Sequence, residues 1–80
     1  MKTVAYRKAA LKGLRKLPAA RQTRIENAIA AHAETGEGDV KALQGRDGAR
    51  LRIGKYRVIF TETEEKIEVF HIGHRKDVYR

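Results

Sequence analysis

Basic and apolar side chains alternate around residue 50 of the sequence. Arg50 and Arg52 flank Leu51, Ile53 follows them, and Arg57 comes a few residues later. If this segment is a strand, Arg50 and Arg52 point to one face, because strand side chains repeat every two residues. Guanidinium groups bind phosphate well, since a planar fork donates two parallel hydrogen bonds and stays charged. The spacing indicates a phosphate-binding face; the alternative is the solvated face of an amphipathic strand, and the sequence leaves the face of Arg57 open.

The last residues of the sequence carry a second set of reactive groups, His74, Arg75 and Tyr79. Histidine moves protons near neutral pH, arginine binds phosphate, and tyrosine stacks on nucleic-acid bases. These groups suit a metal-free cleavage of RNA in which the ribose 2′-oxygen attacks the phosphate. That reaction needs a base for the 2′-hydroxyl, cations beside the phosphate and an acid for the leaving 5′-oxygen.

The charge of the chain is large and unevenly distributed. Its 80 residues contain 18 Lys and Arg against 10 Asp and Glu, a net charge of +8. Residues 1–33 hold eight bases and one acid, Glu26, whereas acids gather in residues 34–39 and 62–65. This segregation indicates a basic face for a polyanion or an acidic protein; the alternative is charge that serves solubility alone.

The composition excludes several kinds of site. Cysteine is absent, which removes disulfides, thiolate zinc sites and cysteine nucleophiles. The three histidines lack metal-ligand spacing, and no Walker loop, GxGxxG or Ser-His-Asp pattern occurs, so we expect neither a metal nor a cofactor. No apolar run approaches the roughly 18 residues of a membrane span and no export signal is visible. We therefore expect a cytoplasmic protein that binds no membrane, with a single domain over residues 1–80.

The first half of the sequence predicts a strand and two helices. Residues 3–6 favour a strand, and the apolar spacing of residues 8–17 and 19–35 is helical. Gly13 weakens the first helix by about 1 kcal/mol relative to alanine. Pro18 separates the helices and suits the opening turn of the second, and Gly36 is placed to end it. His32 lies on the apolar stripe of the second helix, where a packed histidine is expected rather than a catalytic one.

The second half predicts strands joined by tight turns. Residues 40–43 form a weak strand or an extended lead-in, and residues 50–53, 56–61 and 66–72 read as strands. Gly54-Lys55 suits a type II′ hairpin turn, and short turns make the last three strands antiparallel neighbours. We therefore predict an α+β fold of order βααβββ, with a helical hairpin on one face of a twisted, mostly antiparallel four-stranded sheet.

Two segments, residues 50–60 and 69–80, together closely resemble the RelE/ParE toxin superfamily, and the Leu17-Pro18 junction fits it too. The resemblance covers essentially the whole chain. It implies a compact βααβββ RelE-like fold and the toxin of a type II toxin–antitoxin pair, neutralised by an antitoxin that wraps around it. RelE-like members cut messenger RNA in the ribosomal A site, whereas ParE-like members bind DNA gyrase and are not nucleases.

The resemblance also implies roles for particular residues. Arg57 matches the arginine that stabilises the transition-state phosphate in RelE-like enzymes, and Arg75 matches the arginine that acts on the leaving group. Tyr79 matches the tyrosine that stacks on the substrate base. The retention of all three favours a nuclease over a gyrase inhibitor.

One departure from the pattern concerns the general base. Arg50 and Arg52 stand where RelE has two lysines, one of them proposed as the general base. An arginine is a poor general base, because its guanidinium group stays protonated at any relevant pH. We expect His74 to take this role, with Lys55 as a weaker alternative and Arg50 and Arg52 binding phosphate.

Three functions remain open at this point. The first is a ribosome-dependent messenger RNA endoribonuclease that arrests translation, and the second is a ParE-like inhibitor of DNA gyrase. A nucleic-acid-binding module without catalysis explains the charge but not the C-terminal motif. For the toxin readings, the charge of +8 predicts an antitoxin segment that is rich in Glu and Asp and folds on binding.

Overall fold

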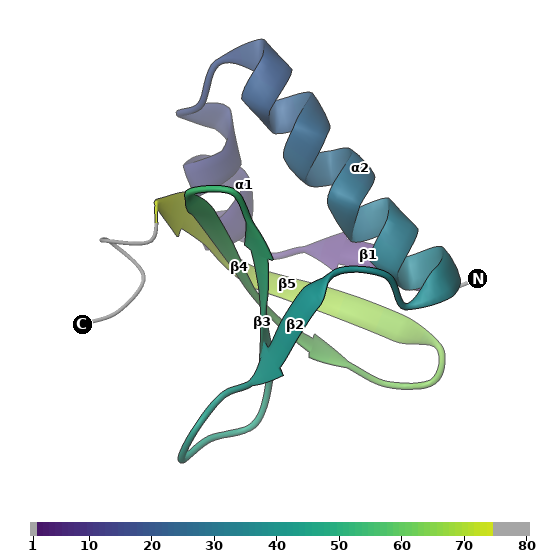
Figure 1. The fold of residues 1–80 in the computed structure, drawn as a ribbon. Coiled ribbons are helices and arrows are strands. Elements are labelled where there is room, and N and C mark those ends of the chain that lie inside the picture. Colours follow the sequence, from purple (N-terminus) through teal and green to yellow (C-terminus); the bar gives the residue numbers. More distant parts are fainter. Residues whose placement is uncertain (1, 75–80) are drawn as a thin grey trace.

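The computed structural model describes residues 2–74 of the chain. The elements, in chain order, are β1 (Thr3–Tyr6), α1 (Lys8–Arg15), α2 (Ala19–Thr35), β2 (Asp39–Ala42), β3 (Ala49–Ile53), β4 (Tyr56–Glu62) and β5 (Lys66–His74). Two helices pack on one face of a mixed sheet, as Figure 1 shows. The predicted α+β class and the order of the helices are therefore confirmed.

The sheet has five strands in the order β1-β5-β4-β3-β2, so the predicted number of four is wrong. The additional strand is β2, which pairs antiparallel with β3 and places Val40 opposite Leu51. Apolar and polar residues alternate only weakly along β2, because it is an edge strand that is mostly exposed. β1 lies at the other edge and is parallel to β5, whereas β3, β4 and β5 are antiparallel neighbours, as predicted.

The core lies between the helices and the sheet. α2 contributes Ile25 and Ile29, which are 0% and 2% exposed, and α1 contributes Ala10 and Leu14. Their partners on the sheet share one face of β3, β4 and β5; they are Leu51, Ile53, Val58, Phe60, Ile67, Val69 and Ile72. Within residues 2–74, no helix covers the other face of β3 and β4 (Figure 1).

The presence of glycine at residue 13 is explained by packing and not by helix propensity. A Cβ atom at residue 13 would clash with the carbonyl oxygen of Ile72. β1 pairs with β5 only as far as Val69, and α1 packs against β5 as well. The glycine therefore lets the backbone of the helix approach the backbone of the strand directly.

The ends of the elements follow the sequence signals. Pro18 occupies the N-cap of α2, and Gly36 ends it in the left-handed region with φ of +79°, its N–H donating to the carbonyl of His32. Gly54 has φ of +60° while Lys55 does not have a positive φ, as a type II′ turn requires. α1 ends at Arg15 rather than at residue 17, because a residue before proline disfavours the helical conformation. None of the helices in residues 2–74 has the length and apolar character that crossing a membrane would need.

Candidate functional site

The face of the sheet opposite the helices, called the outer face below, carries the arginines singled out by the sequence. Leu51 and Val58 are opposite each other and point into the core. Arg52 and Arg57 are the next pair along and therefore point outward, because strand side chains alternate. Arg50 precedes Leu51 on β3 and shares this face. The register that the sequence left open thus places Arg50, Arg52 and Arg57 on the outer face together.

Like charges stand directly opposite each other at two places on the outer face. Arg52 pairs with Arg57 across β3 and β4, and Lys41 pairs with Arg50 across β2 and β3. A directly opposed pair of like charges destabilises a sheet by up to about 1 kcal/mol. Asp39, on the far side of Arg52, offsets part of this repulsion. A bound anion would offset more, so the arrangement suits a phosphate ligand.

The three arginines differ in exposure. Arg57 is 9% exposed, Arg50 is half-buried and Arg52 is exposed. Gly73 lies opposite Arg57 on β5 and adds no side chain to this part of the face. A guanidinium held among its neighbours loses less rotamer entropy on binding than one in solvent. Arg57 is therefore the most preorganised of the three cations.

His74 lies on the other side of the sheet. It is opposite Tyr56, with the two ring centroids 5.9 Å apart and the planes at 83°. Tyr56 packs against the core cluster, so this pair belongs to the helix-covered face. The structure therefore does not bring His74 to the face of Arg57.

His71 is the imidazole that the register places on the outer face, opposite Ile59. A bulge between Ile59 and Phe60 shifts the pairing with β5 by one residue and reverses the direction of the following side chains. The sequence does carry a signal for it, because the buried positions Ile67, Val69 and Ile72 break the spacing of two.

A hollow between α1 and β5 is lined in part by the residues of this stretch of β5. Its volume is ≈ 520 Å³, and its lining residues include Lys12, Lys16, His71 and His74. Lys55, the weaker alternative for the base, lies exposed in the turn between β3 and β4. Arg75 and Tyr79 lie outside the described residues, so their roles stay predictions.

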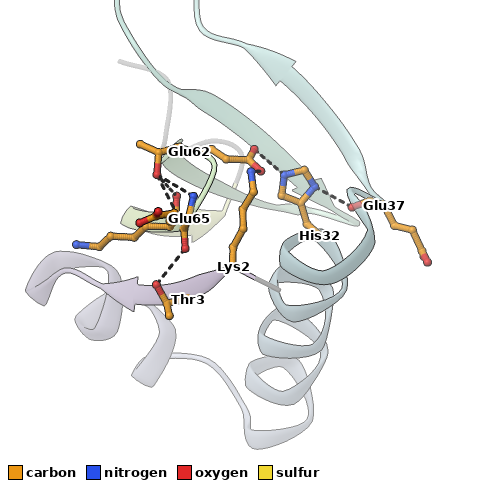
Figure 2. Close-up of polar contacts among 8 residues, drawn as sticks. Lys2, Thr3, His32, Glu37, Glu62 and Glu65 are labelled. Carbon is orange, nitrogen blue, oxygen red and sulfur yellow. Dashed lines mark hydrogen bonds and ion pairs between the residues drawn. The ribbon is translucent and has the colours of Figure 1, made fainter.

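His32 is buried and not part of the outer face, which confirms the predicted packed histidine. It is 8% exposed, and its ring meets Phe60 edge to face at 5.4 Å. Nδ1 lies 3.1 Å from the carbonyl oxygen of Glu37 and Nε2 lies 3.0 Å from Oε1 of Glu62 (Figure 2). Both ring nitrogens of His32 therefore face acceptor oxygens. The contact ties the end of α2 to the end of β4.

Glu62 is held as a carboxylate by its neighbours. Desolvation by itself would raise the pKa of Glu62, but hydrogen bonds from Lys2 and His32, with their charges, outweigh it and lower the pKa. Lys2 reaches the second carboxylate oxygen, as Figure 2 shows. The cluster joins the N-terminus, α2 and β4, and its chemistry is structural. Within residues 2–74, no group of three or more His, Cys, Asp or Glu side chains is placed to hold a metal ion.

Comparison with known proteins gives a match along nearly the whole chain. Residues 4–79 match the family described as the ParE toxin of the type II toxin–antitoxin system, parDE. A search of curated proteins found no match.

Several solved structures with the same fold are toxins, some of them in complexes with their antitoxins. The RelE–RelB complex of Pyrococcus horikoshii OT3 gives a TM-score of 0.78 at 26% identity, over 92% of this chain and 94% of that chain. The RelB–RelE complex of Methanococcus jannaschii gives 0.76 at 24% identity, over 94% of both chains. A copper-bound mutant toxin from Helicobacter pylori gives 0.81 at 12% identity, over 99% of this chain and 100% of that chain.

Proposed function

The chain belongs to the ParE toxin family of type II toxin–antitoxin systems, and from this premise we propose that it is a ribosome-dependent endoribonuclease that cuts messenger RNA. Its fold is shared with RelE toxins crystallised with RelB antitoxins. The antitoxin is therefore one partner of the chain, and the ribosome with its messenger RNA is the proposed target.

The observation that carries this proposal is the placement of Arg50, Arg52 and Arg57 on one face of the sheet. In RNA cleavage the 2′-oxygen forms a bond to phosphorus while the bond to the 5′-oxygen breaks. The products are a 2′,3′-cyclic phosphate and a free 5′-hydroxyl. Negative charge grows on the phosphoryl oxygens in the transition state, where preorganised guanidinium groups stabilise it.

Proton transfer requires groups other than these arginines. An imidazole accepts the proton of the 2′-hydroxyl, and His71 on the outer face is better placed for this than the predicted His74. Arg75 neutralises the leaving 5′-oxygen and Tyr79 stacks on a base, as the resemblance to RelE-like enzymes implies. The ribosome orients the 2′-oxygen and supplies the catalytic groups that the chain lacks.

The first test is the loss of cleavage in Arg57→Ala. Removing one donor to the transition state should lower the cutting rate about 100-fold or more. Expression of the wild type should stop protein synthesis and leave transcripts cut within codons, which mapping of transcript ends measures. Arg15→Ala, which removes the same charge from an exposed helical position, is the matched control and should cut like the wild type.

Two further variants separate chemistry from folding. Arg57→Lys keeps the charge but loses the two-pronged donor, so it should also cut poorly. The double variant Arg57→Ala with Arg75→Ala should abolish toxicity while circular dichroism shows an intact fold. Unchanged toxicity in a folded double variant would reject the assigned roles.

A second candidate function is inhibition of DNA gyrase without catalysis, and the match to the ParE toxin family favours it. Here the basic residues would bind the partner. Induction would then trigger the DNA-damage response and filamentation while transcripts stay intact. Rapid arrest of translation with cut transcripts points to the nuclease instead.

The antitoxin is proposed to be acidic and to carry apolar side chains. A net charge of +8 steers such a segment by long-range attraction. Complex formation should therefore be faster at low ionic strength, which stopped-flow mixing measures. An association rate that is indifferent to salt would contradict an acidic partner.

A further inference from the structure

The β2–β3 hairpin projects away from the helices (Figure 1). A basic hollow lies beside Arg50 and is lined mainly by residues of β2 and of the loop that ends this hairpin. Its volume is ≈ 550 Å³, within the range of small-molecule sites. The lining residues combine three cations, one amide and two small or apolar side chains, with no acid among them; they are Lys41, Ala42, Leu43, Gln44, Arg46 and Arg50. This composition suits an anionic ligand that also has hydrogen-bonding edges.

Among residues 2–74, no acidic side chain lines the hollow. Lys41 stands opposite Arg50 in the register, so two positive charges meet across β2 and β3. Within residues 2–74, the ion pairs found join Lys2 and His32 to Glu62 and Arg7 to Glu68, and neither Lys41 nor Arg46 takes part. A phosphate between the strands would offset this repulsion.

The loop that closes the hollow has a defined shape. The N–H of Leu43 donates to the carbonyl of Gly48 at 3.1 Å, which closes the loop at its base. Gly45 and Gly48 have φ of +75° and +113°, conformations that side chains beyond glycine rarely adopt. A Cβ atom at residue 48 would lie 3.0 Å from the carbonyl oxygen of Phe60, so the loop packs closely on β4. Gln44 and Arg46 are therefore carried on a preformed turn.

The hollow is near the proposed cleavage position. Lys41 and Arg50 form the outer-face pair next to Arg52 and Arg57 along β3. Adjacent strands lie about 4.8 Å apart, so β2 is about 10 Å from β4. A neighbouring nucleotide of the same RNA strand can span this separation.

We propose that this hollow binds the nucleotide next to the scissile phosphate, with Lys41 and Arg50 on its phosphate and Gln44 on the edge of its base. The inference rests on the proposed nuclease function and deepens it. A glutamine amide both donates and accepts, so it pairs with the edge of an unstacked base. Arg46 stacks on the base or adds a second donor, as arginine does with single-stranded RNA. Gln44 is then a specificity residue and Arg46 an affinity residue.

The test compares cut sites after induction of the wild type, Gln44→Ala, Arg46→Ala and the control Arg15→Ala. The wild type should prefer one base beside the cut by roughly tenfold, the worth of a good base contact. Gln44→Ala should bring this preference close to even while total cutting stays within about threefold of the wild type. Arg46→Ala should lower cutting several-fold at all sites, and Arg15→Ala should change neither quantity.

The outcomes separate the two proposals. A wild type that cuts with a base preference that Gln44→Ala retains overturns the subsite and leaves the nuclease standing. Cutting without any base preference overturns the role of Gln44 in the same way. Transcripts left intact by the wild type overturn the nuclease and, with it, this subsite. Both residues lie in an exposed loop, and thermal melting of each variant checks that the fold is kept.

Discussion

On the helix-covered face of β3 and β4, Leu51 and Val58 are 2% and 0% exposed, whereas Arg52 on the outer face of the same strands is exposed. Burial of apolar side chains fixes the first face and is the main source of stability. The outer face instead holds like charges opposite each other, which lowers stability. The helix-covered face of these strands thus stabilises the fold, whereas the outer face is the one that we propose binds phosphate. Substitutions on each face should therefore affect stability in different ways.

The largest effect on stability should come from the helix-covered face. Phe60 is 1% exposed at the centre of the core, so Phe60→Ala should lower the free energy of unfolding by about 3–5 kcal/mol. Urea denaturation followed by circular dichroism measures this loss. Thr61→Ala, one residue away on the other face, is the comparison and should cost far less. Similar losses for the two variants would contradict the division between the faces.

Gly13→Ala tests the edge where α1 packs on β5. An alanine normally stabilises a helix relative to glycine by about 1 kcal/mol. Here its Cβ would meet the carbonyl oxygen of Ile72, so we expect a net loss of about 1–3 kcal/mol. Lys12→Ala, at the preceding exposed position, is the control for helix propensity. A Gly13→Ala variant as stable as the control would show that β5 shifts to accommodate the Cβ atom without a loss in the free energy of unfolding.

The cluster of Lys2, His32 and Glu62 should make the free energy of unfolding depend on pH, whereas the outer face should not. The pKa of Glu62 in the folded state is below its usual value of 4.5, so the folded state favours the carboxylate. This contribution is present above the usual pKa and is lost as pH falls through the lowered one. The wild type should therefore lose its advantage over Glu62→Gln as acid is added, in urea titrations at several pH values. A constant difference between the two would contradict the lowered pKa.

The smallest effect, and one of opposite sign, belongs to the outer face. Lys41→Gln removes one of two facing positive charges and should raise the free energy of unfolding by a few tenths of a kcal/mol, about 1 kcal/mol at most. The gain should shrink in high salt, because salt screens exposed charges. Lys66→Gln, opposite Thr3 in the register, is the control and should change little. Loss of stability in Lys41→Gln would show that the lysine serves folding.

Much of the fold follows from local signals in the sequence. The helix spacing, Pro18, Gly36 and the Gly54 turn set the two helices and the β3–β4 hairpin, because each signal acts within a few residues. For β2 the sequence predicts only a weak strand or an extended lead-in, because an exposed edge strand needs no alternation of apolar and polar residues.

The candidate site was less predictable than the fold. Arg50, Arg52 and Arg57 could be named from their types and spacing, but their common face depends on the pairing of β3 with β4. His74 was expected beside them, and the bulge near Ile59 turns it to the other face while bringing His71 outward. A single extra residue in a strand has this effect, and only the break in apolar spacing announces it.

The parallel pairing of β1 with β5 has a consequence for synthesis. Thr3 lies opposite Lys66, so the first strand to leave the ribosome finds its partner only when the last strand has emerged. Contacts so distant along the chain form late, after the loop between them has closed. A growing chain still attached to the ribosome that makes it therefore lacks the completed sheet. The toxin acquires its complete sheet only after β5 has been translated.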